Sequence, residues 1–402
     1  RHLVVIFDEN VSFDHYFGTY PYAPNPPGEP AFRARPGTPT VNGLYSDITR
    51  AGPGGPRLTR NPNLSNPVRL GHDQPMTCDQ DHFYTAEQNA ADHGLEDLYA
   101  QNTGEHQTLA RCLAGLTYQG KPEPIPAGAD KNYAVMDYYD GNTVTALWNY
   151  AQHFAMSDNN YGTTYGTSTL GALNVAAANT YGATCGPASD TINDQPCGAP
   201  PGLNLARLLA SHITTGRGGQ VPLSRQPAAG PGTLTDDADP TYDICSYLPS
   251  RYGGDGLTPG DTVTMGGNNI GQELTKAGIT WGWFEGGFDH GYVPGHGRPP
   301  TTAQICAEQH QNVGGKSVTD YVPHHEPFQY YASTANPMHL PPTSVAMIGH
   351  SDRASHQYDT ADFWAAADSG CPRSRSSRPR PTRTATPATR TRWTSRPGWP
   401  AR

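Results

Sequence analysis

The stretch HLVVIFDENVSFDHYFGTYP (residues 2–21) begins with an apolar run and continues into three polar residues, Asp8, Glu9 and Asn10. The run is too short for a helix, so we expect a buried, central β-strand. In open α/β sheets, ligands bind at the carboxyl ends of the strands, where these three residues would lie. A carboxylate and a carboxamide together are hard oxygen ligands for a divalent cation. The alternative is that Asp8 or Asn10 only caps the next helix.

The composition predicts a globular α/β core that carries long loops. The chain has 402 residues, enough for a large core, and Gly (45) and Pro (39) make up a fifth of it. We find no run of 18 apolar residues, so no membrane span is expected. The chain starts at Arg1, inside the predicted strand, and we therefore expect a fragment or a processed chain. A signal peptide for a secreted or periplasmic protein would have been lost with the missing part.

The seven cysteines predict disulfide bonds and not a structural zinc site. No two cysteines form a C-x-x-C pair, which is the usual spacing of such sites. Without Cys371, six cysteines remain, an even number that is typical of an exported protein. Cys185 and Cys197 enclose a short loop and are the favoured pair. Buried free thiols remain the alternative.

The composition changes at Cys371. Residues 371–402 contain nine of the 27 Lys and Arg residues and no Asp or Glu, which leaves residues 1–370 with 18 basic and 36 acidic side chains. The Arg- and Pro-rich tail has almost no aliphatic residues and cannot pack a core. One interpretation is a basic arm that binds nucleic acid or membranes. We favour a translational frameshift, because the codons of residues 373–396 also permit AVSFLKAPAYQDGHAGYSDPLDEQ in the neighbouring frame. We thus expect an incomplete catalytic domain at 1–370 and a non-native, disordered tail at 371–402.

Four segments predict helices. They are residues 81–104 with Gly104 as the stop, a helix after Asn142 as N-cap whose inner face has Val144, Leu147, Trp148 and Ala151, a helix that begins near Ser168, and a helix within 268–287 that ends at a Gly. The last of these is followed by the apolar run ITWGWF. This order of helix and strand indicates βα alternation and a mostly parallel sheet.

Ser168 and several histidines are candidates for chemistry. Ser168 follows Gly166 and precedes a predicted helix, where unpaired N–H groups favour an anion such as phosphate. Its hydroxyl could also be a nucleophile if a metal lowers its pKa, whereas a plain capping role is the alternative. The chain has 16 histidines, among them His82 and the pair His324-His325, which Pro residues flank. Any single histidine can equally be structural.

The segments ENVSFDHYFGTYP, TCDQDH, AMSDNNYGTTYGTS, GITWGWFEGG, HHEPFQYYA and SVAMIGHSDRASHQYDTADFWAAADSG occur in this order over nearly all of residues 1–370. Together they resemble the bacterial phosphoesterase family of secreted phospholipases C and acid phosphatases. The resemblance implies an alkaline-phosphatase-like fold, in which a central, mostly parallel β-sheet has helices on both faces. It also implies that the C-terminal part of this fold is missing here.

The resemblance assigns roles to matching positions. Glu9, Asn10 and Ser168 would bind a divalent metal ion of unknown identity, and Ser168 would be the nucleophile. His82, His324 and His325 would line the phosphate pocket. The implied reaction passes through a phosphoseryl intermediate and acts on a phosphate monoester or a phospholipid, the latter with transient contact to a membrane surface. Members of the family carry further metal ligands downstream, so this chain is expected to be inactive or unstable as written.

Three other functions compete with this interpretation. A sulfatase is disfavoured, because no Cys or Ser lies in a C/S-x-P-x-R pattern. A secreted, non-catalytic remnant that binds phosphate or glycans stays open. A nucleic-acid binder is disfavoured by the acidic excess of residues 1–370. The sequence leaves the oligomeric state undetermined.

Overall fold

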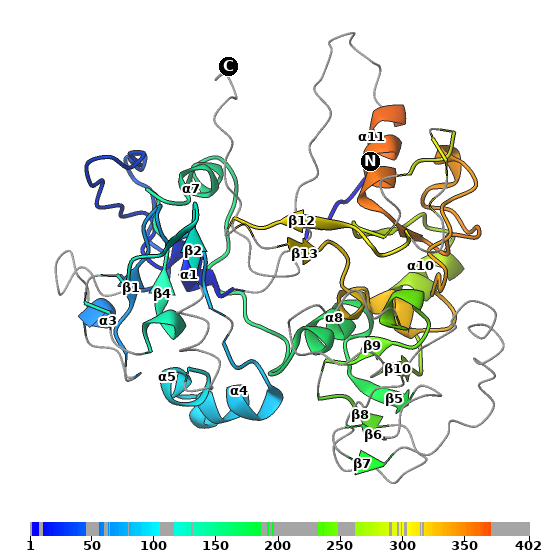
Figure 1. Ribbon diagram of the computed structural model, residues 1–402, viewed down its shortest axis with the longest axis horizontal. Helices are drawn as coiled ribbons and strands as arrows, with labels where there is room; N and C mark the ends of the chain where they lie inside the picture. The colour runs from blue at the N-terminus through cyan, green and yellow to red at the C-terminus, as the bar shows by residue number, and fades with distance from the viewer. Residues whose placement is uncertain are drawn as a thin grey trace. The chain divides into compact units, whose positions relative to one another are not determined.

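The computed structural model describes residues 2–7, 11–45, 56–59, 63, 65–78, 80–104, 116–126, 128–129, 132–185, 191–192, 195–196, 232–235, 237–247, 262–288, 292–295, 297–298, 300, 304–313, 315 and 317–370. The predicted metal ligands Glu9 and Asn10, as well as residues 371–402, lie outside this part. The described residues form two compact units, one within Arg1–Tyr165 and Gln311–Lys316 and one within Gly166–His310 and Ser317–Ala388 (Figure 1). Helices and small sheets occur in both, which is consistent with an α/β fold.

Among its described residues, the first unit contains short helices and two pairs of short strands. Its elements are α1 (Phe13–Phe17), α3 (Pro56–Thr59), β1 (Val68–Arg69), α4 (Tyr84–Ala90), η1 (Asp92–Gly94), α5 (Tyr99–Asn102), β2 (Thr117–Tyr118), β3 (Lys121–Pro122), η2 (Tyr133–Val135), β4 (Asp137–Tyr138) and α7 (Thr145–Ala151). Strands β1 and β4 pair in parallel, and β2 and β3 pair antiparallel.

The core of the first unit is built around Trp148 of α7, which is fully buried. Its ring packs edge-on against Tyr20 and Phe32, with centroid distances of 5.2 and 5.0 Å. Its indole N–H donates to the carbonyl oxygen of Tyr16 at 2.7 Å, so the polar end of the ring is also satisfied. These contacts hold α1 and the following loop against α7.

The second unit contains the longer helices. Its elements are α8 (Ser168–Ala177), β5 (Tyr181–Cys185), β6 (Thr191–Ile192), β7 (Gln195–Pro196), β8 (Gly232–Thr233), β9 (Asp239–Pro240), η3 (Ile244–Tyr247), β10 (Thr262–Met265), α10 (Ile270–Lys276), β11 (Trp283–Phe284), β13 (Ser317–Thr319), η5 (Pro323–His325), η6 (Pro327–Tyr330), η7 (Val345–Met347), β14 (Gln357–Tyr358) and α11 (Thr360–Gly370), while β12 (Gln309–Gln311) lies at its boundary.

The strands of the second unit form several small sheets. The largest has the order β8-β5-β10-β9, in which β10 is antiparallel to β5 and parallel to β9. Strands β11 and β14 form a parallel pair. Helix α8 contacts η5 and η6, and β9 contacts the same two turns. Helix α8 therefore lies beside η5, the turn that contains His324.

The prediction of a buried first strand is wrong. Residues 2–7 belong to no strand, and the side chains of Leu3 and Ile6 are 89% and 86% exposed. A strand needs a neighbour to satisfy its backbone groups, and the structure describes no partner strand for this segment. The single central parallel sheet does not occur among the described strands either, which lie in the small sheets above.

The helix predictions fare better. Helix α8 begins at Ser168, as expected, and α10 ends before Gly278, whose φ of +68° favours glycine. The segment 81–104 is helical but is broken at Asp92 and His93, which both have positive φ. Asn142 is not the cap of α7, since its buried side chain bonds to Asn25 and to the carbonyl of Pro30.

A disulfide joins Cys245 to Cys306, a pair that the sequence analysis did not single out. The favoured partner of Cys185, Cys197, lies outside the described residues, so that prediction remains open. Within the described chain, no helix has the length and apolar character that crossing a bilayer requires.

Candidate functional site

Ser168 is the first residue of α8. The preceding Thr167 is extended (φ −71°, ψ 167°) and buried, which turns the chain into the helix, and Ser168 itself is half-buried. The first N–H groups of a helix have no partners within the helix, so they and the helix dipole attract anions. Ser168 therefore presents a hydroxyl where a phosphate group is favoured.

Asp237 anchors the same helix end. The backbone N–H of Thr169 donates to Oδ1 of Asp237 at 3.0 Å, and the Thr169 hydroxyl donates to the same oxygen at 2.9 Å. The carboxylate of Asp237 thus takes the role of a cap, although it lies 68 residues away in the chain. One of its oxygens, Oδ2, is left to face a different neighbour.

That neighbour is His324, which lies in η5. Its Nε2 atom is 4.0 Å from Oδ2 of Asp237, and its Nδ1 atom is 3.1 Å from Oδ1 of Asp239. A carboxylate only accepts hydrogen bonds, so Nδ1 carries the hydrogen and Nε2 points toward Asp237. The buried imidazole is held between two carboxylates beside the N-terminus of α8.

Tyr330 ties this group together. Its hydroxyl donates to the carbonyl oxygen of Ala238, between Asp237 and Asp239. Burial, together with the nearby Asp239, raises the pKa of Tyr330 well above its usual value, so the phenol stays protonated. Tyr330 belongs to η6, which contacts α8. The loop of the two aspartates is therefore fixed from η6 as well as from α8.

His325 completes the part of the predicted site that lies in this unit. It is half-buried, and its ring centroid is 4.6 Å from that of His324, with the two rings nearly perpendicular. The structure thus brings Ser168, His324 and His325 into contacting elements, α8 and η5. Their joint role in a phosphate pocket remains a prediction.

His82 belongs to the first unit. It precedes α4, its Nδ1 atom is 2.9 Å from the carbonyl oxygen of Gln80, and its ring stacks on Phe83. Because each unit is described by itself, a place for His82 beside Ser168 stays a prediction. The same holds for Glu9 and Asn10, which are outside the described residues.

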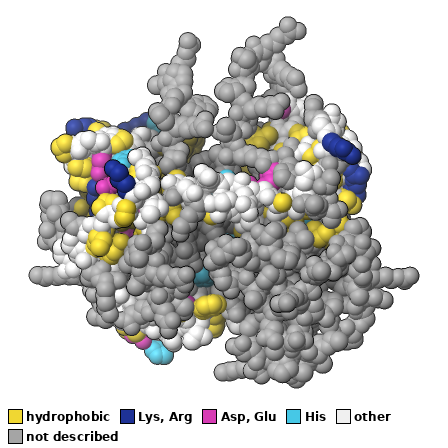
Figure 2. Space-filling view, in the orientation of Figure 1, with side chains coloured by type: hydrophobic (Ala, Val, Ile, Leu, Met, Phe, Trp, Pro, Cys, Tyr) yellow, Lys and Arg dark blue, Asp and Glu magenta, His cyan; other side chains and the backbone are white. Residues whose placement is uncertain are grey.

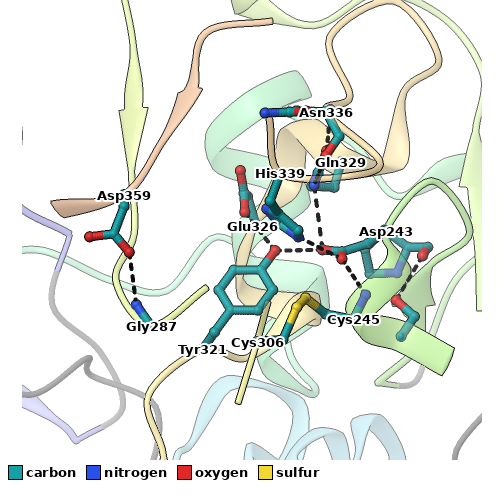
Figure 3. The surroundings of a disulfide bond; sticks show 12 residues. Asp243, Cys245, Gly287, Cys306, Tyr321, Glu326, Gln329, Asn336, His339 and Asp359 are labelled. Atoms are coloured by element: carbon teal, nitrogen blue, oxygen red, sulfur yellow. Dashed lines mark hydrogen bonds and ion pairs between the residues drawn. A yellow bond between two sulfur atoms is a disulfide. The ribbon is translucent and has the colours of Figure 1, made fainter. Parts of the chain in front are cut away.

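A second buried group of polar side chains surrounds the disulfide (Figure 3). Asp243, Cys245, Cys306 and His339 form the group of potential metal ligands found in the described chain, and their ligand atoms lie within 4.8 Å of one another. None of the four was predicted from the sequence to bind a metal.

Asp243 is the centre of this group. It accepts from Nε2 of His339 at 2.8 Å, from the backbone N–H of Cys245 at 2.7 Å, and contacts the Tyr321 hydroxyl at 2.5 Å. Burial alone would raise the pKa of Asp243, but His339 and the hydrogen bonds outweigh burial and lower it. Asp243 is therefore ionised.

Glu326 differs from Asp243, because its pKa is raised and not lowered. Its Oε2 atom is 2.6 Å from the Tyr321 hydroxyl, and burial, together with Glu285 and Asp243, raises the pKa of Glu326 well above its usual value. A phenol has one hydrogen, which can serve only one of the two carboxyl groups that contact Tyr321. Protonated Glu326 can donate to Tyr321 while Tyr321 donates to Asp243. The network then has one negative charge, which faces His339.

Asp237, Asp239 and Thr169 were not predicted from the sequence to belong to the site. Both aspartates lie in the stretch DDADP, which has no recognisable motif spacing, and their histidine is 85 residues further along the chain from Asp239. The position of Thr169 directly after Ser168 was the available signal. A polar residue there, at the start of a helix, often contributes to the cap.

A comparison with models of known protein families matches residues 1–371 to the Phosphoesterase family. A search of curated proteins returned no significant match. The matched region ends where the composition changes, at Cys371.

Proposed function

Because the chain belongs to the phosphoesterase family and is a hydrolase of phosphate esters, we propose that it cleaves them with Ser168 as the nucleophile. The observation that carries this proposal is the position of Ser168 at the N-terminus of α8, with His324 held nearby between Asp237 and Asp239. This arrangement combines a hydroxyl, an anion-binding helix end and an oriented proton carrier.

The first step that we propose is attack of the Ser168 oxygen on phosphorus. The bond from phosphorus to the leaving oxygen breaks, and an imidazole takes the proton of the Ser168 hydroxyl and passes it to the departing oxygen. His324 suits this role because Asp239 fixes its Nδ1 hydrogen, while Nε2, the proposed proton-transfer atom, lies 4.0 Å from Oδ2 of Asp237. His325 lies next to it and is the alternative donor.

In the second step, water hydrolyses the phosphoseryl group. The neutral imidazole takes a proton from the attacking water and passes it to the departing Ser168 oxygen, and inorganic phosphate is released. The dipole of α8, whose Thr169 N–H is bound to Asp237, favours the negative charge of the phosphate oxygens in both steps.

The proposal includes a divalent metal ion. Glu9, Asn10 and Ser168 provide a carboxylate, a carboxamide and a hydroxyl, which are hard oxygen donors of the kind that such ions prefer. When bound, the ion would lower the pKa of the Ser168 hydroxyl and offset phosphate charge. The buried group around Asp243 does not supply this site in the oxidised protein, because its two sulfur atoms are bonded to each other.

The substrate class that we propose is that of phospholipases C or acid phosphatases in a secreted or periplasmic protein. Selectivity for a choline headgroup would need an aromatic cage, for which the chain offers 22 Tyr residues. Turnover of phosphatidylcholine vesicles beside p-nitrophenyl phosphate separates the two types. Figure 2 shows the described Lys and Arg side chains on the face drawn, beside hydrophobic, acidic and other side chains.

The test is hydrolysis of p-nitrophenyl phosphate by the 402-residue chain and by a protein in which the neighbouring frame is restored after residue 371, before and after EDTA and after metal is added back. We expect metal-dependent turnover by the frame-restored protein, which Ser168→Ala abolishes, and little or none by the 402-residue chain. Turnover that survives both EDTA and Ser168→Ala contradicts the proposal. Binding of phosphate without any turnover would favour the non-catalytic alternative.

We further propose that residues 371–402 are not part of the catalytic domain. Their Arg-rich composition and the end of the family match at residue 371 support this. Sequencing the gene around codon 371 is the direct test: an open neighbouring frame that encodes the expected segment supports the frameshift, and a closed frame contradicts it.

A further inference from the structure

The group around the disulfide has the chemistry of a metal site. Asp243, Cys245, Cys306 and His339 are all at most 1% exposed, and their ligand atoms lie within 4.8 Å of one another. Two sulfur atoms, an imidazole nitrogen and a carboxylate oxygen make up a four-ligand set of the type that binds Zn²⁺ tetrahedrally. The ligand atoms of such a site are separated by roughly 3 to 4 Å, given metal–ligand bonds of about 2.0 to 2.3 Å.

The disulfide decides whether this set is available. In the oxidised protein each sulfur is bonded to the other, so neither can be a thiolate ligand. We propose that reduction of the Cys245–Cys306 bond converts this group into a binding site for Zn²⁺ or a similar transition-metal ion. The disulfide and the bound metal are then two alternative cross-links of the same segments, which are 61 residues apart.

The surroundings of the group fit a structural metal. Ile244, Phe288, Ile305 and Tyr321 pack around the two cysteines in one buried hydrophobic cluster. Such a dry, closed environment is typical of structural zinc sites, whereas catalytic sites keep a position open for water. We therefore expect no hydrolytic activity from this metal.

Hydrogen bonds that orient the ligands are already present. Tyr321 and the backbone N–H of Cys245 both bind the Asp243 carboxylate, as partners of metal ligands commonly do. One ring nitrogen of His339, Nδ1, is buried and has no hydrogen-bond partner in the described part of the chain. A buried polar atom without a partner is uncommon and often marks the place of an ion or water.

Reduction and metal binding are two separate steps. A phosphine and one water molecule reduce the disulfide to two thiols, and the phosphine leaves as its oxide. Metal binding then releases the two thiol protons, and His339 binds as the neutral imidazole. Two thiolates and the Asp243 carboxylate together carry three negative charges, of which Zn²⁺ neutralises two. Glu326 is kept protonated by burial, so it adds no further negative charge beside the site.

Cobalt provides the readout. We would reduce the full chain with a phosphine, remove the excess without air, and titrate it with Co²⁺, whose thiolate complexes have a charge-transfer band in the near ultraviolet. We expect the reduced protein to bind one Co²⁺ more than the reduced Cys245→Ser/Cys306→Ser variant, with the band present only in the former. Zn²⁺ should abolish the band by displacing Co²⁺. The double variant keeps all other cysteines, so it corrects for their contribution.

Two further comparisons make the test decisive. The oxidised protein should lack the band, and Asp243→Asn should weaken Co²⁺ binding by at least about tenfold, whereas the exposed control Asp368→Asn should not. Equal Co²⁺ binding by the reduced protein and the double-serine variant overturns the inference. A reduced chain that loses its circular-dichroism spectrum and does not regain it with Co²⁺ overturns it too.

Discussion

The Nδ1 atom of His324 lies 3.1 Å from Oδ1 of Asp239, a buried pair formed across 85 residues of sequence. This contact fixes which ring nitrogen holds the hydrogen, and Asp237, on the other side of the ring, also holds the N-terminus of α8. The proposed proton carrier and the proposed nucleophile are thus linked through one short acidic segment.

Asp239→Asn should impair turnover without unfolding the protein. The amide can donate to Nδ1 and so favour the wrong tautomer of His324, which leaves Nε2 protonated at the wrong stage. We expect kcat to fall by about 10²- to 10⁴-fold with little change in KM. Steady-state kinetics check this, with the exposed Asp368→Asn as the matched control. An unchanged kcat would show that Asp239 does not act through His324.

Asp237→Ala should destabilise the start of α8, because Thr169 loses the acceptor for both its N–H and its hydroxyl. The loss of such a cap costs about 1 kcal/mol. Asp237→Asn keeps an oxygen acceptor and should lose much less. The midpoints of urea unfolding for the two variants measure the difference. If both variants are equally destabilised, the cap is not the main role of Asp237.

The buried carboxyl group of Asp362 should make the stability of the protein depend on pH. Burial, then the nearby Asp359, raises the pKa of Asp362 to about 7, and both carboxyl oxygens lack hydrogen-bond partners among the described residues. The folded state therefore holds this proton at pH values where the unfolded state has released it. The contribution of the Asp362 carboxyl group to the free energy of unfolding is therefore complete below about pH 4 and is lost as the pH rises toward 7.

Asp362→Asn removes this titration. We expect the variant to be more stable than the wild type by about 4 kcal/mol at pH 8 and about equal to it at pH 4. Chemical unfolding at both pH values provides the measurement, and the exposed Asp368→Asn is the control. A difference between the variant and the wild type that is the same at pH 4 and pH 8 would contradict the assigned pKa shift.

Trp148 tests the core of the first unit. Trp148→Phe removes a fully buried indole ring and leaves the Tyr16 carbonyl without its donor. We expect a loss of about 2 kcal/mol in the free energy of unfolding. Trp364 is 49% exposed, so Trp364→Phe is the matched control. We expect it to lower the free energy of unfolding by at most about 0.5 kcal/mol. Equal losses would mean that Trp148 is not a core residue.

Local signals in the sequence predicted local structure well. Helix α10 has the capping box between Asn269 and Gln272, and Gly278 directly follows its last turn, so both ends are encoded by nearby residues. Helix α8 was predicted for a similar reason, since Gly166 and a run of small polar residues precede its apolar face. Three of the four residues expected on the inner face of α7 are packed in the core, whereas Leu147 is partly exposed.

Features that depend on distant residues were not predictable in this way. An apolar run such as residues 2–7 is a strand only if other strands pair with it, and periodicity cannot supply the partners. The partner of Cys245 is 61 residues away, and no spacing rule selects Cys306 over the other cysteines. Asp237 and Asp239 likewise became candidates only when folding brought them to His324.

The central claim is that Ser168 carries the phosphoryl group during turnover. The direct measurement is an acid quench of the enzyme during hydrolysis of p-nitrophenyl phosphate, followed by peptide mass spectrometry. We predict a phosphorylated peptide whose modified residue is Ser168, and its absence in Ser168→Ala and in the EDTA-treated enzyme. A turning-over enzyme with unmodified Ser168 and undiminished activity in Ser168→Ala would contradict the account.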